Sequence, residues 1–210
     1  MPESSFDPID AFRGALDDAG VTHERVHPGQ ATAALERAVE EPAVGVPIDV
    51  ADDVELPAGV ATDFAPTDLQ AARTGVTPAR LGVAETGSLL VRSTSEGDEL
   101  VSLYPEHHVA VVRASDVVAN VPAATSWLAD EVDAGRDSYV FATGASATAD
   151  MGALVEGVHG PTHVHVVVVD PDRDTEASDA DASDADVSDV EGSDADGIDT
   201  DASDEGVTGS

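Results

Sequence analysis

The segment from Ser138 to Asp170 constrains the fold most, because strand-like and helix-like patterns alternate within it. Ser138–Thr143 is short, apolar and rich in strand formers, and His163–Asp170 holds four consecutive valines, as a strand buried on both faces does. Between them, apolar residues recur at helical spacing, at Met151, Leu154, Val155 and Val158. We predict a strand–helix–strand unit with a right-handed crossover, and therefore an α/β domain.

A loop of small residues joins the first of these strands to the helix. It runs from Gly144 to Ala149 and carries hydroxyl groups at Ser146 and Thr148, and Asp150 follows it. In open α/β sheets, ligands bind outside the carboxyl ends of the strands, where a helix N-terminus presents free N–H groups. Two interpretations stay open: the hydroxyls only cap the helix, or the loop also binds a small anion. The missing lysine excludes a P-loop.

The chain is strongly acidic, with 43 Asp and Glu residues against 9 Lys and Arg and a net charge of −34. Residues 172–210 hold 15 of these acids in SDAD-like repeats and have almost no bulky apolar side chains. Such a segment buries too little apolar surface to fold. We therefore predict a folded domain over residues 1–171, with its motifs in 75–170, and a disordered acidic tail over 172–210.

This charge points to the environment of the protein more than to its substrate. Self-repulsion weakens a compact state unless salt screens it, so we expect a halophilic protein from the cytoplasm of a salt-loving archaeon. Phosphates would be repelled, which argues against a nucleic-acid partner. There is no signal-peptide pattern and no apolar run of about 18 residues, so we expect no membrane span. The absence of cysteine excludes a thiolate-bound iron–sulfur cluster, and we expect no cofactor bound directly.

Shorter patterns place elements along the rest of the chain. They predict helices over residues 6–19, 32–40, 69–73 and 115–132, and strands over residues 21–26, 44–48, 83–92, 100–104 and 109–113. The strands 83–92 and 100–104 flank the turn-like SEGDE segment and predict a β-hairpin. Ser115 or Asp116 is expected to cap the helix over 115–132, and Pro122 to disturb it.

Glu85 is the first candidate catalytic residue. It lies in the AETG segment, where its neighbours are apolar or small, so we expect partial desolvation of its carboxylate. Such a group can act as a general base, or as a nucleophile in acyl transfer. The alternative is a carboxylate that only accepts hydrogen bonds from backbone N–H groups at a turn.

Histidines form the second set of candidates. His159 precedes Gly160 in the GVHGP segment and is a candidate site residue, although a structural role beside the turn is the alternative. His163 and His165 alternate, so they face the same side of the last strand. Together with Glu156 these histidines match no standard zinc spacing, and we predict no metal site.

Four segments occur in a fixed order: AETG, LYPEHHVAVV, TGASATAD and GVHGP. Over residues 75–170 this ordered set resembles the LUD domain found in the lactate utilisation protein C family. The resemblance implies a three-layer α/β sandwich like that of ribose-5-phosphate isomerase, glucosamine-6-phosphate deaminase and CoA transferases. It also implies a link to oxidation of L-lactate to pyruvate together with iron–sulfur partner subunits.

Two functional hypotheses follow from the residues and the resemblance together. The first is an accessory subunit of an iron–sulfur-dependent L-lactate oxidation system, with a small anionic metabolite as a possible ligand. The alternative is a small-molecule enzyme that acts on a sugar phosphate or an acyl-CoA through Glu85 and the Gly144–Asp150 loop. The expected ligand-binding residues are Thr86, Gly87, Gly144, Ser146, Thr148, Asp150 and Gly160. Ala147 replaces an arginine usual in the family, which removes an anion-pairing group unless Arg80 or Arg92 supplies the charge.

Overall fold

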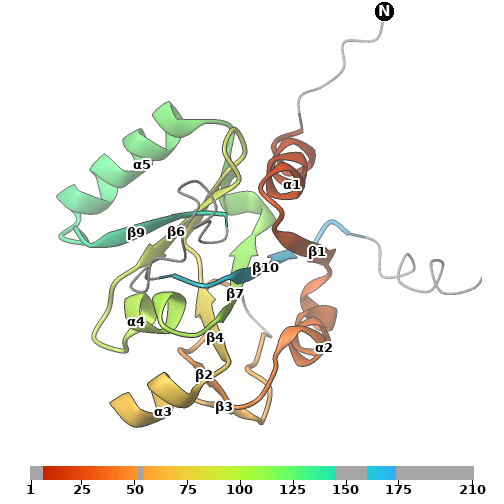
Figure 1. Ribbon diagram of the computed structural model, residues 1–210. Coiled ribbons are helices and arrows are strands. Elements are labelled where there is room, and N and C mark those ends of the chain that lie inside the picture. The colour runs from red at the N-terminus through yellow and green to blue at the C-terminus, as the bar shows by residue number, and fades with distance from the viewer. Residues whose placement is uncertain (1–6, 52–53, 145–159, 174–210) are drawn as a thin grey trace, which may run out of the picture. The chain divides into compact units, whose positions relative to one another are not determined.

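A computed structural model describes residues 7–51, 54–144 and 160–173 (Figure 1). By its internal contacts the chain divides into two units, Met1–Thr175 and Glu176–Ser210. The second unit lies outside the described residues, so the acidic tail and the domain boundary stay predictions. The predicted helix around Met151–Val158 also lies outside them.

A six-stranded sheet forms the centre of the first unit, and all its neighbouring strands are parallel. Its order is β1 (Thr22–Val26), β10 (His163–Val169), β7 (His107–Arg113), β4 (Thr74–Pro78), β2 (Ala43–Gly45) and β3 (Val60–Ala61). Strand β10 lies between β1 and β7, and Val166, Val167 and Val168 are fully buried. The predicted strand with two buried faces is therefore confirmed.

A second sheet contains β8 (Val117–Val118), β5 (Leu81–Val83), β6 (Ser88–Arg92) and β9 (Tyr139–Thr143) in that order. Strand β9 is antiparallel to β6, so β9 and β10 belong to different sheets. The predicted crossover within one sheet is therefore wrong. The half-exposed residues of β9 suit an edge strand, whereas the consecutive valines of β10 need cover on both faces.

The hairpin also differs from the prediction. Strands β5 and β6 pair with each other, and the AETG segment, Ala84–Gly87, is the turn between them. The predicted strand over residues 100–104 is wrong, because residues 100–103 belong to helix α4 (Asp98–Leu103) and Tyr104 caps its end. Acidic residues in its first turn, Asp98 and Glu99, favour the helix, and the Thr94 hydroxyl donates a hydrogen bond to Asp98.

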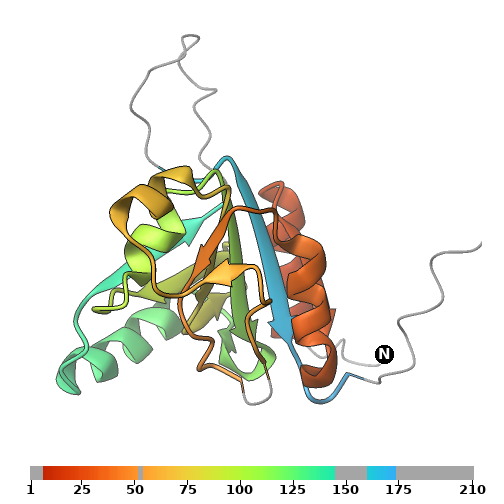
Figure 2. The same cartoon turned by 90° about the horizontal axis from the view of Figure 1, so that it is seen from below.

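Helices cover both sheets. Helix α1 (Pro8–Asp18) buries one face between the two sheets, whereas α2 (Pro28–Ala38) packs on the other face of the parallel sheet. Helix α5 (Val121–Asp133) covers the outer face of the second sheet, and α3 (Pro66–Ala71) packs near β2. Figure 2 shows α2 beside β10 and α5 beside the second sheet. The result is a mixed α/β fold, consistent with the predicted three-layer sandwich.

Several helix starts differ from the expected ones, and α3 begins at Pro66 and not at residue 69. Helix α2 begins at Pro28 and not at Thr32, because the His27 ring accepts a hydrogen bond from the Gly29 N–H and caps the helix. The predicted helix from residue 115 begins instead at Val121, after a 3₁₀ turn and β8. Its cap is Asn120, which accepts a hydrogen bond from the Ala123 N–H at 3.0 Å.

Pro122 therefore lies in the first turn of α5, where a missing N–H costs nothing, and the expected disturbance is wrong. Among the residues that the structure describes, no helix is both long and apolar enough to cross a membrane.

Candidate functional site

The turn of the β5–β6 hairpin and the end of β9 lie side by side. Ser88 and Thr143 are directly paired across the two strands. The Thr86 hydroxyl lies 2.7 Å from the Ser88 hydroxyl, which lies 2.6 Å from the Thr143 hydroxyl. This chain of three hydroxyl groups links the AETG turn to Gly144, where the predicted small-residue loop begins. The structure thus brings together two segments that the sequence places more than fifty residues apart.

We call the place where the AETG turn meets Thr143 and Gly144 the corner. Two of its glycines pack closely against the end of helix α1. Gly87 has a φ of 64°, and a Cβ there would lie 3.0 Å from the carbonyl carbon of Ala15. Gly144 has a φ of 68° and would place a Cβ 3.5 Å from that of Ala19. Only glycine adopts these backbone conformations without strain, so both residues have a structural role. Their predicted contact with a ligand stays a prediction.

Glu85 points outward from the turn. Its side chain is exposed, so the expected desolvation of the carboxylate is wrong. The carboxylate accepts a hydrogen bond from the Val121 N–H at 3.1 Å, and the Glu85 N–H donates one to the Ala119 carbonyl at 3.1 Å. A carboxylate at the N-terminus of α5 is stabilised by the free N–H groups there. The structure explains Glu85 as an anchor of α5, and its catalytic role stays a prediction.

A hollow of about 200 Å³ lies beside the end of β9 and the start of β10. The described residues around it include Ser102, His108, Phe141, Thr143, Gly144 and Gly160. Three of the predicted motif segments thus meet at one hollow, LYPEHHVAVV through His108, TGASATAD through Thr143 and Gly144, and GVHGP through Gly160. Ser146, Thr148, Asp150 and His159 lie outside the described residues, so their predicted roles are untested.

His108 lies in the LYPEHHVAVV segment and lines this hollow, although it is not among the predicted site residues. It is fully buried, and its Nε2 lies 2.8 Å from the Thr77 hydroxyl. Burial, with a smaller contribution from His107, lowers the pKa of His108 to about 4, so the ring is neutral near pH 7. A neutral imidazole provides one donor and one acceptor without a charge. The available signal was its position in the alternation with Ala110 and Val112, which face the same buried side.

Neither arginine proposed as a replacement for the missing loop arginine lies at this corner. Arg80 forms an ion pair with Asp49 at 2.8 Å. Arg92 pairs with Tyr139, at the opposite end of the β6–β9 ladder from Ser88. Within the described part of the chain, no group of three or more His, Cys, Asp or Glu residues is arranged to hold a metal ion.

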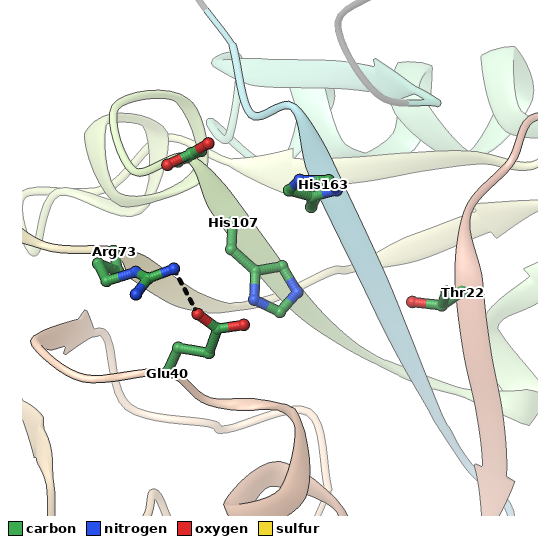
Figure 3. A pocket seen from close by; sticks show the side chains of 6 residues that line it. Thr22, Glu40, Arg73, His107 and His163 are labelled. Carbon is green, nitrogen blue, oxygen red and sulfur yellow. Dashed lines mark ion pairs between the residues drawn. The ribbon is translucent and has the colours of Figure 1, made fainter. Parts of the chain in front are cut away.

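A further hollow, of about 310 Å³, opens at the amino ends of the parallel strands (Figure 3). Its lining includes Thr22, Glu40, Arg73, Glu106, His107 and His163. We expected ligand sites at the carboxyl ends of the strands. The hollow beside β9 adjoins the carboxyl end of β9 as well as the starts of β7 and β10, whereas the second hollow lies at amino ends only. The two hollows lie on opposite faces of β7, because His107 and His108 are consecutive residues of one strand.

The two sheets, their helices and the motif-lined corner define a mixed α/β protein. The model of the LUD domain matches residues 57–169, and the chain belongs to the LUD domain family.

Several known proteins are similar to this chain. Lactate utilization protein C of Deinococcus radiodurans is 34% identical over 104 residues, which cover 49% of this chain and 49% of that protein. Lactate utilization protein C 1 of Bacillus mycoides is 32% identical over 105 residues, covering 48% of this chain and 45% of that protein. The chain thus spans about half the length of these curated relatives.

A crystal structure of a DUF162 family protein from Deinococcus radiodurans is similar in fold. It superposes with a TM-score of 0.63 at 24% sequence identity, covering 80% of this chain and 99% of that one. At this identity the similarity concerns the fold alone.

Proposed function

We propose that this protein acts in lactate utilisation, as an accessory subunit of an iron–sulfur-dependent system that oxidises L-lactate to pyruvate. The observation that carries the proposal is the LUD domain match over residues 57–169, together with relatives named lactate utilization protein C. The matched range includes the AETG turn and Thr143–Gly144, which meet in the structure. We further propose that these segments form the ligand site.

The accessory role follows from the chemistry of the electron transfer. Oxidation of lactate to pyruvate removes two electrons and two protons from the C2 carbon and its hydroxyl, so an electron acceptor is needed. Iron–sulfur clusters are held mainly by cysteine thiolates, and this chain has no cysteine. The residues present do not fit a cluster, and we therefore place the clusters on partner subunits.

The hollow beside β9 suits a small ligand, and its lining combines apolar side chains with a few polar groups. Its volume of about 200 Å³ is below the range usual for drug-sized ligands, and is better matched to a three-carbon acid than to a nucleotide-bearing cofactor. The Thr143 hydroxyl and the neutral His108 ring offer hydrogen bonds without adding charge. We propose a small hydroxy or keto acid as the ligand of this hollow.

A gene deletion tests the role in lactate utilisation. We expect growth on L-lactate to be lost and growth on an unrelated carbon source to be kept, and the wild-type gene to restore the former. A tagged copy should also co-purify with cysteine-rich iron–sulfur proteins. Unchanged growth of the deletion strain on lactate would contradict the proposal.

The alternative is an enzyme that acts on a sugar phosphate or an acyl-CoA through Glu85 and the Gly144–Asp150 loop. The adjacency of the AETG turn and Gly144 supports it. The outward position of Glu85, hydrogen bonded to the Val121 N–H, speaks against it.

Thermal shift in molar KCl separates the two proposals, using phosphorylated sugars, CoA esters, lactate and pyruvate as ligands. Stabilisation only by lactate or pyruvate supports the first proposal, and stabilisation by a phosphate or CoA ester supports the second. If the protein turns over a sugar phosphate or a CoA ester, undiminished turnover of that substrate by a Glu85→Gln variant would exclude a catalytic role for Glu85.

A further inference from the structure

The polar hollow at the amino ends of β1, β4, β7 and β10 is not used by the proposed function. We propose that it binds a small zwitterion, a molecule such as a free amino acid that carries one ammonium and one carboxylate group. This hollow and the hollow beside β9 lie on opposite faces of β7. The present proposal therefore does not rest on the role in lactate utilisation.

The parallel register brings the lining residues together. His107 is paired with Thr74 on one side and with His163 on the other, and Arg73 immediately precedes Thr74. Thr22 begins β1 beside the same end of β10. Four strands that are distant in sequence therefore begin around one hollow. Each contributes a polar side chain to its lining from its first residue or the residue before it.

Glu40 lies in the segment that follows α2, and it lines this hollow. Two hydrogen bonds hold its backbone in place. The Glu40 N–H donates a hydrogen bond to the Thr74 hydroxyl at 3.0 Å, and the same hydroxyl donates one to the Glu40 carbonyl at 2.9 Å. Thr74 is fully buried. This double hydrogen bond ties the Glu40 backbone to the start of β4, next to Arg73.

Glu40 and Arg73 form an ion pair that a ligand can divide. Arg73 Nη2 lies 2.7 Å from Glu40 Oε2. Figure 3 shows the pair beside the His107 ring. The side chains are 58% and 61% exposed, so the pair contributes little to the stability of the fold. A zwitterion can place its ammonium group on Glu40 and its carboxylate on Arg73. The ligand ammonium then replaces Arg73 as the partner of Glu40, and the ligand carboxylate replaces Glu40 as the partner of Arg73. Both protein charges therefore keep an opposite charge beside them.

Two imidazole rings complete the hollow. The rings of His107 and His163 meet edge to face, with centroids 6.5 Å apart. Burial and the nearby His165 and His163 lower the pKa of His107, while Glu40 acts in the opposite direction. A neutral ring offers a donor and an acceptor that can bind the polar groups of a zwitterion.

The charges of the lining select among small ligands. Glu40 and Glu106 bring two carboxylates against the one guanidinium of Arg73. This excess negative charge disfavours a simple carboxylate anion, such as acetate or lactate. A simple amine would bind to the carboxylates but would leave Arg73 without a ligand group. We therefore expect amino acids to bind more tightly than amines, and amines more tightly than carboxylates.

Histidine-ring NMR of the full chain tests the site, with glycine, L-alanine, ethylamine, acetate and L-lactate titrated at one fixed salt concentration. We expect the ring signals of His107 and His163, assigned with single His→Gln variants, to shift saturably with an amino acid. Glu40→Gln and Arg73→Gln should each weaken that binding about tenfold or more, through the loss of a charged hydrogen bond.

Arg113→Gln and Asp116→Asn provide matched controls, because Arg113 and Asp116 form a partly exposed ion pair at the other end of β7. Both controls should bind as the wild type does, and circular dichroism checks that every variant is folded. Three outcomes would overturn the proposal: no saturable shift of the His107 and His163 signals with any ligand, shifts of these two signals by acetate or lactate at concentrations as low as for the amino acids, or equal losses in the controls. None of these outcomes would alter the case for a role in lactate utilisation.

Discussion

His108 and Thr77 share a buried hydrogen bond, with His108 Nε2 2.8 Å from the Thr77 hydroxyl oxygen. The two residues lie on the neighbouring strands β7 and β4, and both are fully buried. His108 also lines the hollow beside β9, so the bond fixes one side chain of that hollow to the neighbouring strand. A buried ring with one fixed partner is costly to protonate, which makes His108 a determinant of the pH range of the fold.

We predict that His108 destabilises the protein in mild acid. Burial lowers the pKa of His108 from 6.5 to about 4, so the unfolded chain takes up a proton at a higher pH than the folded chain. The stabilising contribution is complete above pH 6.5 and declines as the pH falls toward 4. Between pH 7.5 and pH 5 the expected loss is about 2 kcal/mol in the free energy of unfolding.

Chemical denaturation at fixed salt, repeated across this pH range, measures the loss. His108→Asn removes the titrating group, so its free energy of unfolding should depend less on pH than that of the wild type, whatever its absolute value. Identical slopes for the two proteins would show that His108 is not the group responsible.

A second prediction concerns the contact between β9 and α5. The Tyr139 hydroxyl donates a hydrogen bond to the Glu131 carboxylate at 2.5 Å, and Arg136 binds the same carboxylate. These two partners, Arg136 first, lower the pKa of Glu131 to about 2. Tyr139→Phe removes one hydrogen bond and should lower the free energy of unfolding by about 1 kcal/mol.

The chain contains its own control for this substitution. Tyr104, the second of its two tyrosines, is exposed, so Tyr104→Phe should leave the stability unchanged. The Tyr139 ring packs edge to face on Trp127 at 5.5 Å, and the fluorescence of this single tryptophan can follow unfolding. Equal stability of the two Phe variants would mean that the Tyr139 hydroxyl does not stabilise the contact.

A third prediction separates backbone strain from crowding at the AETG turn. Gly87→Ala forces an alanine into a left-handed conformation and places its Cβ 3.0 Å from the backbone of Ala15. We expect a loss of at least about 2 kcal/mol in the free energy of unfolding. Gly135 also has a positive φ, of 80°, but a Cβ at this residue would have no neighbouring atom within 4 Å.

Gly135→Ala should therefore cost only the strain of the backbone, about 1 kcal/mol. The difference between the two variants in a denaturant titration measures the close packing of the AETG turn on α1. A Gly87→Ala variant no less stable than Gly135→Ala would refute this close packing.

The elements with long or clear apolar patterns could be predicted from the sequence. The α1 face of Ile9, Phe12 and Leu16 and the valines of β10 are local signals, and both predictions are confirmed. The stretch Leu100–Leu103 was not predictable in this way, because a short apolar run fits a strand or a helix equally well. The acidic residues of its first turn, Asp98 and Glu99, favour the helix.

Less of the site than of the fold was predictable. The AETG segment and Gly144 could be recognised in the sequence as parts of motifs. That they lie side by side could not be predicted, because it depends on the pairing of Ser88 with Thr143. The outward direction of Glu85 depends on a turn geometry that no local pattern specifies. The meeting of His107 and His163 likewise arises from the register of two strands that are not consecutive in the chain.

The last prediction concerns salt. The chain carries a net charge of −34, and most of its acidic residues lie outside the tail segment, so the folded domain repels itself. The screening length falls to about 3 Å at 1 M salt. We therefore expect the melting temperature to drop markedly when KCl is lowered below roughly 1 M.

Screening must be distinguished from a general effect of concentrated solutes on burial. Sucrose stabilises folded proteins by exclusion from their surface but leaves charge repulsion in place. Dilute buffer with sucrose at the water activity of the KCl solution should therefore restore only part of the lost stability. A melting temperature that is equal in dilute buffer and in about 3 M KCl would contradict the prediction, because repulsion on this scale cannot be indifferent to screening.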